Sequence, residues 1–283
     1  KVNGNAMPRL EASDGSAIVR VNADGGFANP AFELGVPHLV ERARAQGIAA
    51  LVINDCTHFS ALWPEVEALT TEGLAALALC PSYASVAPTG GSQPLLGTNP
   101  LAFGWPRRGG EPYVFDFATS VAARGEIELK RRAGEPIPEG WALDAQGQPT
   151  LDPEAALAGA MLPFGGHKGS AISTMIELLA GIMIGDLTSL ESLRQLGGTN
   201  LSPMHGELVI AFSPERFSAG RGGNPIERAE HLFDAILGQG ARLPSQRRFA
   251  ARAKARTDGI PLTAAEIAQL DRLASGGLDA VAL

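Results

Sequence analysis

The sequence predicts an α/β fold, and three observations support this prediction. Apolar runs of strand length occur at Ala17–Val21, Ile48–Ile53 and Leu74–Cys80. Segments with helical periodicity, at Pro30–Gln46 and Pro64–Thr71, alternate with these runs. Hydrophobic residues make up 45% of the 283 positions, which is enough to bury a sizeable core. Strands and helices that alternate along the chain are typical of α/β proteins.

The first predicted helix has recognisable ends. Pro30 suits a first helical turn, where its missing N–H has no partner to lose. Apolar residues then recur at helical spacing until Gly47, which ends the helix. Pro37 lies inside the segment, and an interior proline predicts a kink or a break. The strand before this helix ends in a turn at Asp24–Gly26.

The middle of the chain alternates irregular stretches with short regular ones. Residues 81–112 are rich in Gly, Pro, Ser and Thr, and so long a loop is usually functional or disordered. A strand is expected at Tyr113–Phe117 and a helix at Ala122–Arg132. Gly134–Pro153 is polar and rich in proline and glycine, which predicts a surface excursion.

The most apolar helix is predicted at Gly169–Gly185. Because its side chains are apolar nearly all round, we expect it to lie at the centre of the fold. Leu187–His205 is expected to be a mobile loop. The remaining expected elements are a strand at Glu207–Phe212, helices at Pro225–Gly238 and Ser245–Lys254, and a last helix that opens with the capping box of Thr263 and Glu266.

Composition and charge argue against several classes of protein. A net charge of −7 disfavours nucleic-acid binding, which usually requires a basic face. No apolar run approaches the roughly 18 residues of a membrane span, and no signal peptide opens the chain. Cys56 and Cys80 are too few for a disulfide framework, so we expect buried free thiols and a cytoplasmic location.

Missing motifs exclude further kinds of site. The histidines are scattered, without the spacing that brings two ligands to one metal, so no protein-held metal is expected. The serine-hydrolase pentapeptide G-x-S-x-G does not occur. The dinucleotide fingerprint G-x-G-x-x-G is also absent, which disfavours a standard Rossmann unit.

Two glycine-containing segments suggest ligand binding. In Gly165–Ser170, two glycines, His167 and Lys168 come just before a strong helix, whose free N–H groups favour an anion such as a phosphate. The alternative is a helix-entry loop with an exposed lysine. In Gly97–Pro100, the glycine permits close approach, and Thr98 and Asn99 offer neutral hydrogen-bonding groups. That segment suits a carboxylate or carbonyl ligand, or it is a plain turn before a strand at Leu101–Phe103.

Two ionisable residues stand at predicted strand ends, where α/β proteins usually bind ligands. His58 follows a buried strand and could bind a ligand or shuttle a proton. It could equally be a structural hydrogen-bond partner. Asp116 lies near the end of its strand, where a carboxylate could hold a ribose hydroxyl or cap the following helix.

These segments together resemble the type-2 malate/L-lactate dehydrogenase family, over about Val19 to Arg248. The resemblance rests on five ordered blocks, which are Thr57–Phe59, Leu96–Pro100, Phe115–Ser120, Ile137–Trp141 and Pro163–Gly169. Within the family, His58–Glu67 most resembles the Δ1-piperideine-2-carboxylate and Δ1-pyrroline-2-carboxylate reductases.

The resemblance implies a fold and an activity. The fold is a non-Rossmann, NAD(P)-binding mixed α/β fold with a large mixed sheet and flanking helices. Residues 17–235 would form the cofactor and substrate core, and residues 1–16 and 236–283 an outer helical part that dimerises. The implied activity is NADPH-dependent reduction of a cyclic 2-imino acid to L-proline or L-pipecolate, in proline metabolism or lysine degradation. The alternatives are NADH as cofactor and a 2-hydroxyacid dehydrogenase as activity.

The resemblance also implies roles for particular residues. Thr98 would contact the substrate, and Glu126 stands where the family often has an Asp in a charge relay. The cofactor would contact His58, Phe59, Ser60, Ala61, Leu62, Asp116, Phe117, Ala118, His167, Lys168, Gly240, Ala241, Arg242, Leu243, Pro244, Ser245 and Gln246. Among these, Lys168 and Arg242 are candidate partners for a 2′-phosphate.

One family feature is missing from the sequence. The proton-donating histidine of the family lies in a Ser-His-Gly segment, followed by a substrate-binding arginine, and no Ser-His-Gly occurs here. We expect this segment to lie upstream of Lys1, because the sequence begins without a Met. A protein that binds the cofactor without turnover is the alternative.

Overall fold

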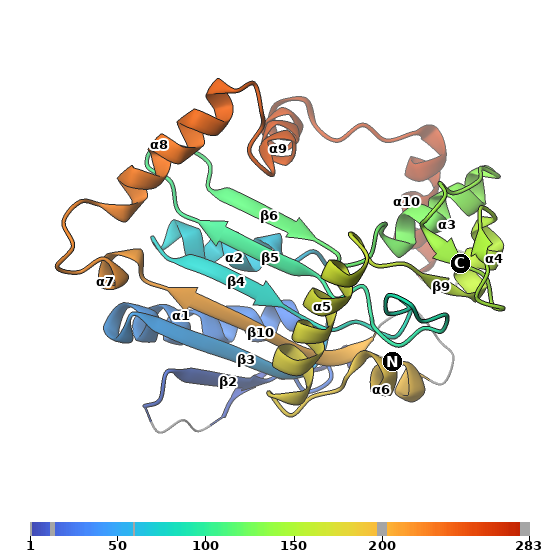
Figure 1. The fold of residues 1–283 in the computed structure, drawn as a ribbon, viewed down its shortest axis with the longest axis horizontal. Coiled ribbons are helices and arrows are strands. Elements are labelled where there is room, and N and C mark those ends of the chain that lie inside the picture. Colours follow the sequence, from blue (N-terminus) through green and yellow to red (C-terminus); the bar gives the residue numbers. More distant parts are fainter. Residues whose placement is uncertain (1, 12–14, 59, 197–202, 278–283) are drawn as a thin grey trace. The chain divides into compact units, whose positions relative to one another are not determined.

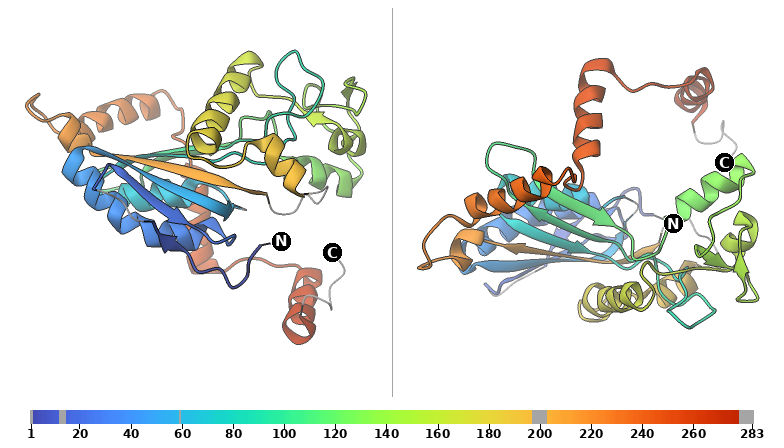
Figure 2. Two further views of the ribbon diagram at one scale, coloured as in Figure 1. Left: turned by 90° about the horizontal axis from the view of Figure 1, so that it is seen from below. Right: turned by 45° about the horizontal axis from the view of Figure 1, so that its top comes forward.

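The computed structural model describes residues 2–11, 15–58, 60–196 and 203–277 (Figures 1 and 2). Contacts divide the chain into two compact units, residues 1–241 and 242–283. The division falls after Ala241, close to the expected core limit at residue 235. The role of residues 1–16 and 236–283 in dimerisation stays a prediction.

A mixed sheet forms the centre of the larger unit, which confirms the predicted fold class. Its seven described strands lie in the order β1-β2-β3-β10-β4-β5-β6. Among them, β2 and β3 pair in parallel, and each of the other neighbouring pairs is antiparallel. The strands are β1 (Arg9–Leu10), β2 (Ile18–Asn22), β3 (Ile48–Thr57), β4 (Ala75–Leu79), β5 (Leu101–Trp105), β6 (Tyr113–Phe117) and β10 (Met204–Phe212).

Helices cover both faces of this sheet, as Figure 2 shows. On one face α1 (Ala28–Gln46) and α2 (Trp63–Thr71) pack on alternate strand residues such as Leu51 and Ile53. The intervening Val52 points to the opposite face. Pro37 does not end α1, which runs without interruption to Gly47.

The apolar helix of residues 169–185 lies on that opposite face, and the prediction that it is central was wrong. It consists of α5 (His167–Ile176) and a π-helical continuation, η1 (Glu177–Ile182). One side packs on the sheet through Ile176 and Ala180. Its other side is exposed, at Met175, Leu178, Ile182 and Met183. A helix on the outer face of a sheet buries only one side within its own chain.

The expected surface excursion at residues 134–153 was also partly wrong. Ile137 and Ala142 are buried in a second hydrophobic cluster, together with Met161. Short strands there form a small three-stranded sheet that α3 and α4 accompany. These elements are β7 (Ala142–Leu143), β8 (Pro149–Thr150), β9 (Ala160–Met161), α3 (Arg124–Ala133) and α4 (Pro153–Ala158).

Residues 187–205 are not simply a mobile loop. Ser189–Leu196 form α6. Ser189 is buried, and it donates hydrogen bonds to Glu177 and Asn99. Residues 197–202 lie outside the described part of the chain. The larger unit ends with α7 (Pro214–Phe217) and α8 (Pro225–Gly238).

The smaller unit contains α9 (Gln246–Asp258) and α10 (Ala264–Gly276). The Thr263–Glu266 capping box is present, as predicted. The described residues of α10 include no buried side chain. Across the described parts of both units, the helices are too short or too polar to cross a bilayer.

Candidate active site

A cavity of about 730 Å³ opens where several strands of the main sheet end. Its walls come from segments that follow β3, β4 and β6 and from segments that precede β5 and β10. The wall includes His58, Ser60, Cys80, Ser82, Tyr83, Thr98, Ala118, Arg124 and His205. Strand ends at which the order of a sheet changes are the usual place for ligands in α/β proteins.

Four of the predicted site residues therefore share one cavity wall, namely His58, Ser60, Thr98 and Ala118. Leu62 is buried and Ala61 is exposed. Phe59 lies outside the described residues. Thr98 is half-buried, as a residue that contacts a small ligand would be.

Asn99 fixes the Thr98 segment to the rest of the molecule. Its side chain is fully buried, and its backbone has φ +31°, which Asn tolerates better than most residues. The amide nitrogen Nδ2 donates to Glu177 Oε1 at 2.7 Å and to Ser173 Oγ at 2.9 Å. The amide oxygen Oδ1 accepts from the backbone N–H of Ser82 and from Ser189 Oγ. Asn99 is therefore a structural anchor, and the ligand contact of Thr98 stays a prediction.

Gly97 is required by the same packing. A Cβ atom at this position would lie 2.3 Å from Asn99 Oδ1 and 2.6 Å from Ser189 Oγ, closer than real contacts allow. Gly97 therefore lets the backbone approach the side chain of Asn99, whereas the sequence suggested an approach to a ligand.

Backbone hydrogen bonds join three of the sequence blocks. The N–H of Thr119 donates to the carbonyl of Thr98 at 2.8 Å, and the N–H of Phe164 donates to the carbonyl of Thr119 at 3.0 Å. Phe117 packs edge-to-face on Phe164, with ring centroids 5.7 Å apart. The segment after β6 therefore lies between the Thr98 segment and the turn that leads into α5.

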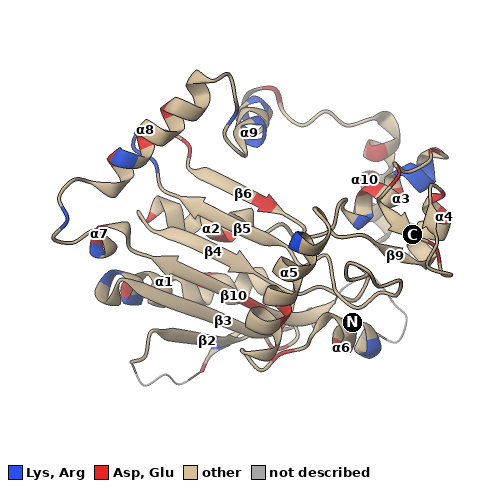
Figure 3. Cartoon of the chain, in the orientation of Figure 1, with Lys and Arg blue, Asp and Glu red and all other residues tan. Residues whose placement is uncertain are grey.

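The turn before α5 has the conformation that its glycines predict. Gly165 and Gly166 have φ +57° and +60°, a region that L-residues with side chains rarely adopt. His167 and Lys168 follow, both exposed in the first turn of the helix. In Figure 3 the ribbon is blue, the colour of Lys and Arg, at the start of α5. A lysine and a histidine at a helix N-terminus suit a phosphate.

Asp116 caps a helix, but not the helix that follows it in the sequence. Its Oδ2 accepts hydrogen bonds from the N–H groups of Leu62 and Trp63, at the start of α2, at 2.8 and 2.9 Å. Burial raises the pKa of Asp116 above its ordinary value, and these hydrogen bonds oppose the rise. The ribose role of this residue stays a prediction.

Glu126 lies in the first turn of α3, beside the cavity-lining Gly125. Its side chain is exposed, and Oε2 accepts a hydrogen bond from the N–H of Ala123. This hydrogen bond caps the N-terminus of α3. The predicted charge-relay role of Glu126 stays a prediction.

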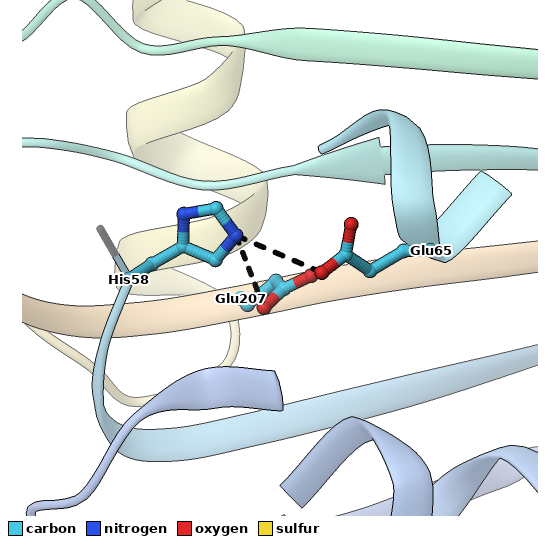
Figure 4. A group of neighbouring side chains, drawn as sticks. All are labelled: His58, Glu65 and Glu207. Atoms are coloured by element: carbon cyan, nitrogen blue, oxygen red, sulfur yellow. Dashed lines mark ion pairs between the residues drawn. The ribbon is translucent and has the colours of Figure 1, made fainter. Parts of the chain in front are cut away.

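His58 stands above two buried carboxyl groups, as Figure 4 shows. Its Nε2 lies 3.8 Å from Glu65 Oε1 of α2 and 4.0 Å from Glu207 Oε2 of β10. All three side chains are at most 3% exposed. Burial alone would lower the pKa of His58, but Glu207, Glu65 and Asp116 raise it above its ordinary value. Burial also raises the pKa of Glu207; the charge of His58 opposes this rise, and Glu65 adds to it.

His205 is the second histidine of the cavity, and its environment acts in the opposite direction. It is completely buried, which lowers its pKa to about 4. Its Nδ1 lies 2.9 Å from the carbonyl oxygen of Gly206. Because a carbonyl only accepts, the neutral ring carries its proton on Nδ1 and donates it to this oxygen. The cavity wall thus pairs a histidine that favours the cation with one that is neutral at pH 7.

The predicted cofactor segment at residues 240–246 straddles the two units. Gly240 and Ala241 end the larger unit, and Arg242–Gln246 begin the smaller one. Within the smaller unit, Gln246 Oε1 accepts a hydrogen bond from the N–H of Leu243. The role of this segment in cofactor binding stays a prediction.

Sequence reasoning missed Glu65, Glu207, His205 and Arg124. Glu207 opens an apolar strand, and a charged residue there was a weak signal of a special position. Nothing in the sequence indicated that Glu65, one of two acidic residues on α2, would meet Glu207. Arg124 precedes the predicted Glu126 by two residues but lines the cavity itself.

Two known proteins resemble this chain closely in sequence. A Δ1-pyrroline-2-carboxylate reductase of Agrobacterium fabrum is 73% identical over 281 residues, which are 99% of this chain and 81% of the relative. A Δ1-pyrroline-2-carboxylate/Δ1-piperideine-2-carboxylate reductase of Pseudomonas aeruginosa is 59% identical, over 93% of this chain and 78% of that protein.

Solved structures give the same result. The Δ1-piperideine-2-carboxylate reductase of Pseudomonas syringae superposes with a TM-score of 0.90 at 43% identity, over 96% of this chain and 81% of that one. A malate dehydrogenase of Entamoeba histolytica, 24% identical, shares the fold with a TM-score of 0.86, over all of this chain and 82% of its own. The family model described as malate/L-lactate dehydrogenase matches residues 1–271. With the mixed sheet, the joined sequence blocks and these matches, the chain belongs to the malate/L-lactate dehydrogenase family.

Proposed function

We propose that this chain is an oxidoreductase that reduces a cyclic 2-imino acid, Δ1-pyrroline-2-carboxylate or Δ1-piperideine-2-carboxylate, to L-proline or L-pipecolate. The observation that carries the proposal is the cavity that Thr98 and His58 share, in a chain 73% identical to a pyrroline-2-carboxylate reductase. In the reaction, C2 of the ring receives a hydride and the ring nitrogen receives a proton, so that the C=N double bond becomes a single bond.

The turn before α5 fits a phosphate of a nicotinamide dinucleotide. The glycine turn before α5 places His167 and Lys168 at a helix N-terminus, where a phosphate is favoured, and a Cβ added at Gly166 would enter open space. A bound nicotinamide would supply the hydride. We further propose NADPH rather than NADH, with Lys168 as a partner of the 2′-phosphate.

The chain's own residues would orient the substrate. Thr98 is held by the buried Asn99 on one side and by its carbonyl bond to Thr119 on the other, so its position in the wall is fixed. A fixed hydroxyl can hold the substrate's carboxylate while C2 lies within about 3–3.5 Å of the hydride donor.

The proposal is tested with purified protein, NADPH and a panel of substrates. Loss of nicotinamide absorbance is expected with the two cyclic imino acids. Clear turnover of oxaloacetate or pyruvate with no turnover of either imino acid would overturn the proposal in favour of a 2-hydroxyacid dehydrogenase. Repeating the assay with NADH measures the cofactor preference directly, and a preference for NADH would reject the NADPH assignment.

We also propose that the protein is a cytoplasmic homodimer. Support comes from the exposed apolar side of α5 and η1, where Leu178, Ile182 and Met183 are each more than half exposed. An apolar patch of this kind usually marks an interface. Cys56 and Cys80 are free and buried, as expected in a reducing compartment. Light scattering that gives the mass of a single chain would reject the dimer.

A further inference from the structure

The buried cluster of His58, Glu65 and Glu207 carries polar atoms without hydrogen-bond partners, and the proposed function assigns no role to the two glutamates. Neither oxygen of Glu65 or Glu207, nor Nε2 of His58, has a hydrogen-bond partner among the described residues. A buried, unpaired carboxylate is costly, and the usual solutions are a proton, a cation or a hydrogen-bond donor. Two carboxylates and a neutral imidazole would leave this cluster with two negative charges.

The number of ligands favours protons over a closed metal site. The donor atoms of the three residues lie within 4.8 Å of one another, so a divalent cation is the competing occupant. A closed zinc site takes four protein ligands, whereas this cluster offers three among the described residues. One proton on the carboxyl pair and one on the imidazole balance the charge without moving any side chain.

The surroundings of His58 support this charge state. The charged and titratable groups that act on it from the neighbouring elements are three acidic residues and one histidine, namely Glu65, Asp116, Glu207 and His205. The acidic groups raise the pKa of His58 despite its burial, and burial raises the pKa of Glu207. His205, 6.4 Å away between ring centroids, is the neutral neighbour.

The orientation of the imidazole connects the cluster to the cavity. Nε2 points toward the two carboxyl groups, and Nδ1 points away from them (Figure 4). His58 also forms part of the cavity wall. An imidazolium in this orientation has one N–H for the carboxyl pair and a second N–H for a ligand.

We propose that Glu65 and Glu207 are positioning residues that share one proton and hold His58 as an imidazolium, whose Nδ1–H binds an anionic oxygen in the cavity. The anion is the carboxylate of the substrate or a phosphate of the cofactor, and this identification rests on the proposed function. A hydrogen bond from a charged donor to an anion is stronger than one from a neutral donor. The charge is present below the raised pKa of His58 and is lost as the pH rises through it.

The first test measures the charge of His58 without using activity. In protein with ¹⁵N-labelled histidine, a His58→Asn variant assigns the resonances of His58. Two protonated ring nitrogens are expected at pH 7, and a neutral ring is expected in the Glu65→Gln/Glu207→Gln double variant. A neutral His58 ring in the unmodified protein at pH 7 would overturn the proposal. So would one equivalent of Zn²⁺ or Mn²⁺ in the purified protein that Glu207→Gln loses.

The second test identifies the anion. The double variant should raise either the KM of the imino acid or the Kd of NADPH about tenfold, the difference between charged and neutral donors. It should also move the alkaline loss of binding to lower pH. Glu72→Gln, at the exposed end of α2, is the matched control and should change neither constant. Both constants unchanged in a folded double variant would reject the ligand role. Because the ¹⁵N measurement needs no turnover, failure of the proposed reaction would be seen separately.

Discussion

Replacing Asn99 with alanine should release the Thr98 segment from the core residues that hold it in place. The substitution removes the side chain that meets Ser82, Ser173, Glu177 and Ser189. It leaves the buried Glu177 carboxylate without one of its donors. It also places a residue with less tolerance for φ +31° at this position.

The expected loss follows from these contacts. A buried hydrogen bond to a charged group contributes about 1.5–3 kcal/mol, and a neutral one about 1 kcal/mol. One charged bond, to Glu177, and three neutral ones, to Ser82, Ser173 and Ser189, give a loss of about 5 kcal/mol in the free energy of unfolding. At about 2–4 °C for each kcal/mol in a chain of this size, Tm should fall by about 15 °C.

Urea denaturation and steady-state kinetics check this prediction together. Asn224→Ala is the matched control, because Asn224 caps the exposed start of α8, and its loss should cost only about 1 kcal/mol. The KM for the imino acid should rise about tenfold or more in Asn99→Ala, since a shift of the Thr98 segment misplaces the substrate. An unfolding free energy within about 1 kcal/mol of the unmodified protein, with an unchanged KM, would refute the anchor role.

Four further results are expected. Gly97→Ala should raise the KM for the imino acid at least as much as Asn99→Ala does, because its Cβ would meet the amide at 2.3 Å; an unchanged KM would contradict the close packing. Lys168→Ala should raise the KM for NADPH about fivefold and leave that for NADH unchanged, whereas equal effects on both would remove Lys168 from 2′-phosphate recognition. The folded protein holds His205 with a pKa of about 4, below its unfolded value, so the unfolded chain binds more protons between pH 6.5 and 4. The free energy of unfolding should therefore fall by about 3 kcal/mol as the pH is lowered from 6.5 to 4, and His205→Gln should reduce this fall. An equal pH dependence of the unfolding free energy in both proteins would show that His205 is not the buried neutral group. Ile182→Glu should convert a dimer to a monomer in light scattering, and an unchanged mass would exclude the exposed side of η1 from the interface.

Local patterns predicted most of the secondary structure. The strand at Tyr113–Phe117 and the helix at Pro225–Gly238 have the predicted limits, because alternation, proline and glycine mark their ends within the sequence itself. The capping box of α10 is equally local. The helix at residues 169–185 shows the limit of this reasoning. Its composition indicates burial, but composition does not specify whether the same chain or another surface covers each side.

The candidate site was predicted only where the sequence carries a compact motif. Thr98 and His58 lie in such segments, and the structure brings them to one cavity. The anchoring role of Asn99 depends on Glu177, which is 78 residues away, and the carboxyl pair under His58 unites α2 with β10. Contacts between elements so distant in the chain arise from the strand order of the sheet, in which β10 lies between β3 and β4. No local pattern encodes that order.

The most direct test of the proposed function is kcat/KM for Δ1-pyrroline-2-carboxylate in the unmodified protein and in Thr98→Val. Valine keeps the shape of the side chain and removes the hydroxyl of this cavity-lining residue. The proposed function predicts turnover of this imino acid by the unmodified protein and a loss of about tenfold or more in the variant, with the Kd for NADPH unchanged. Equal kcat/KM values in the two proteins, or turnover confined to 2-keto acids, would contradict it.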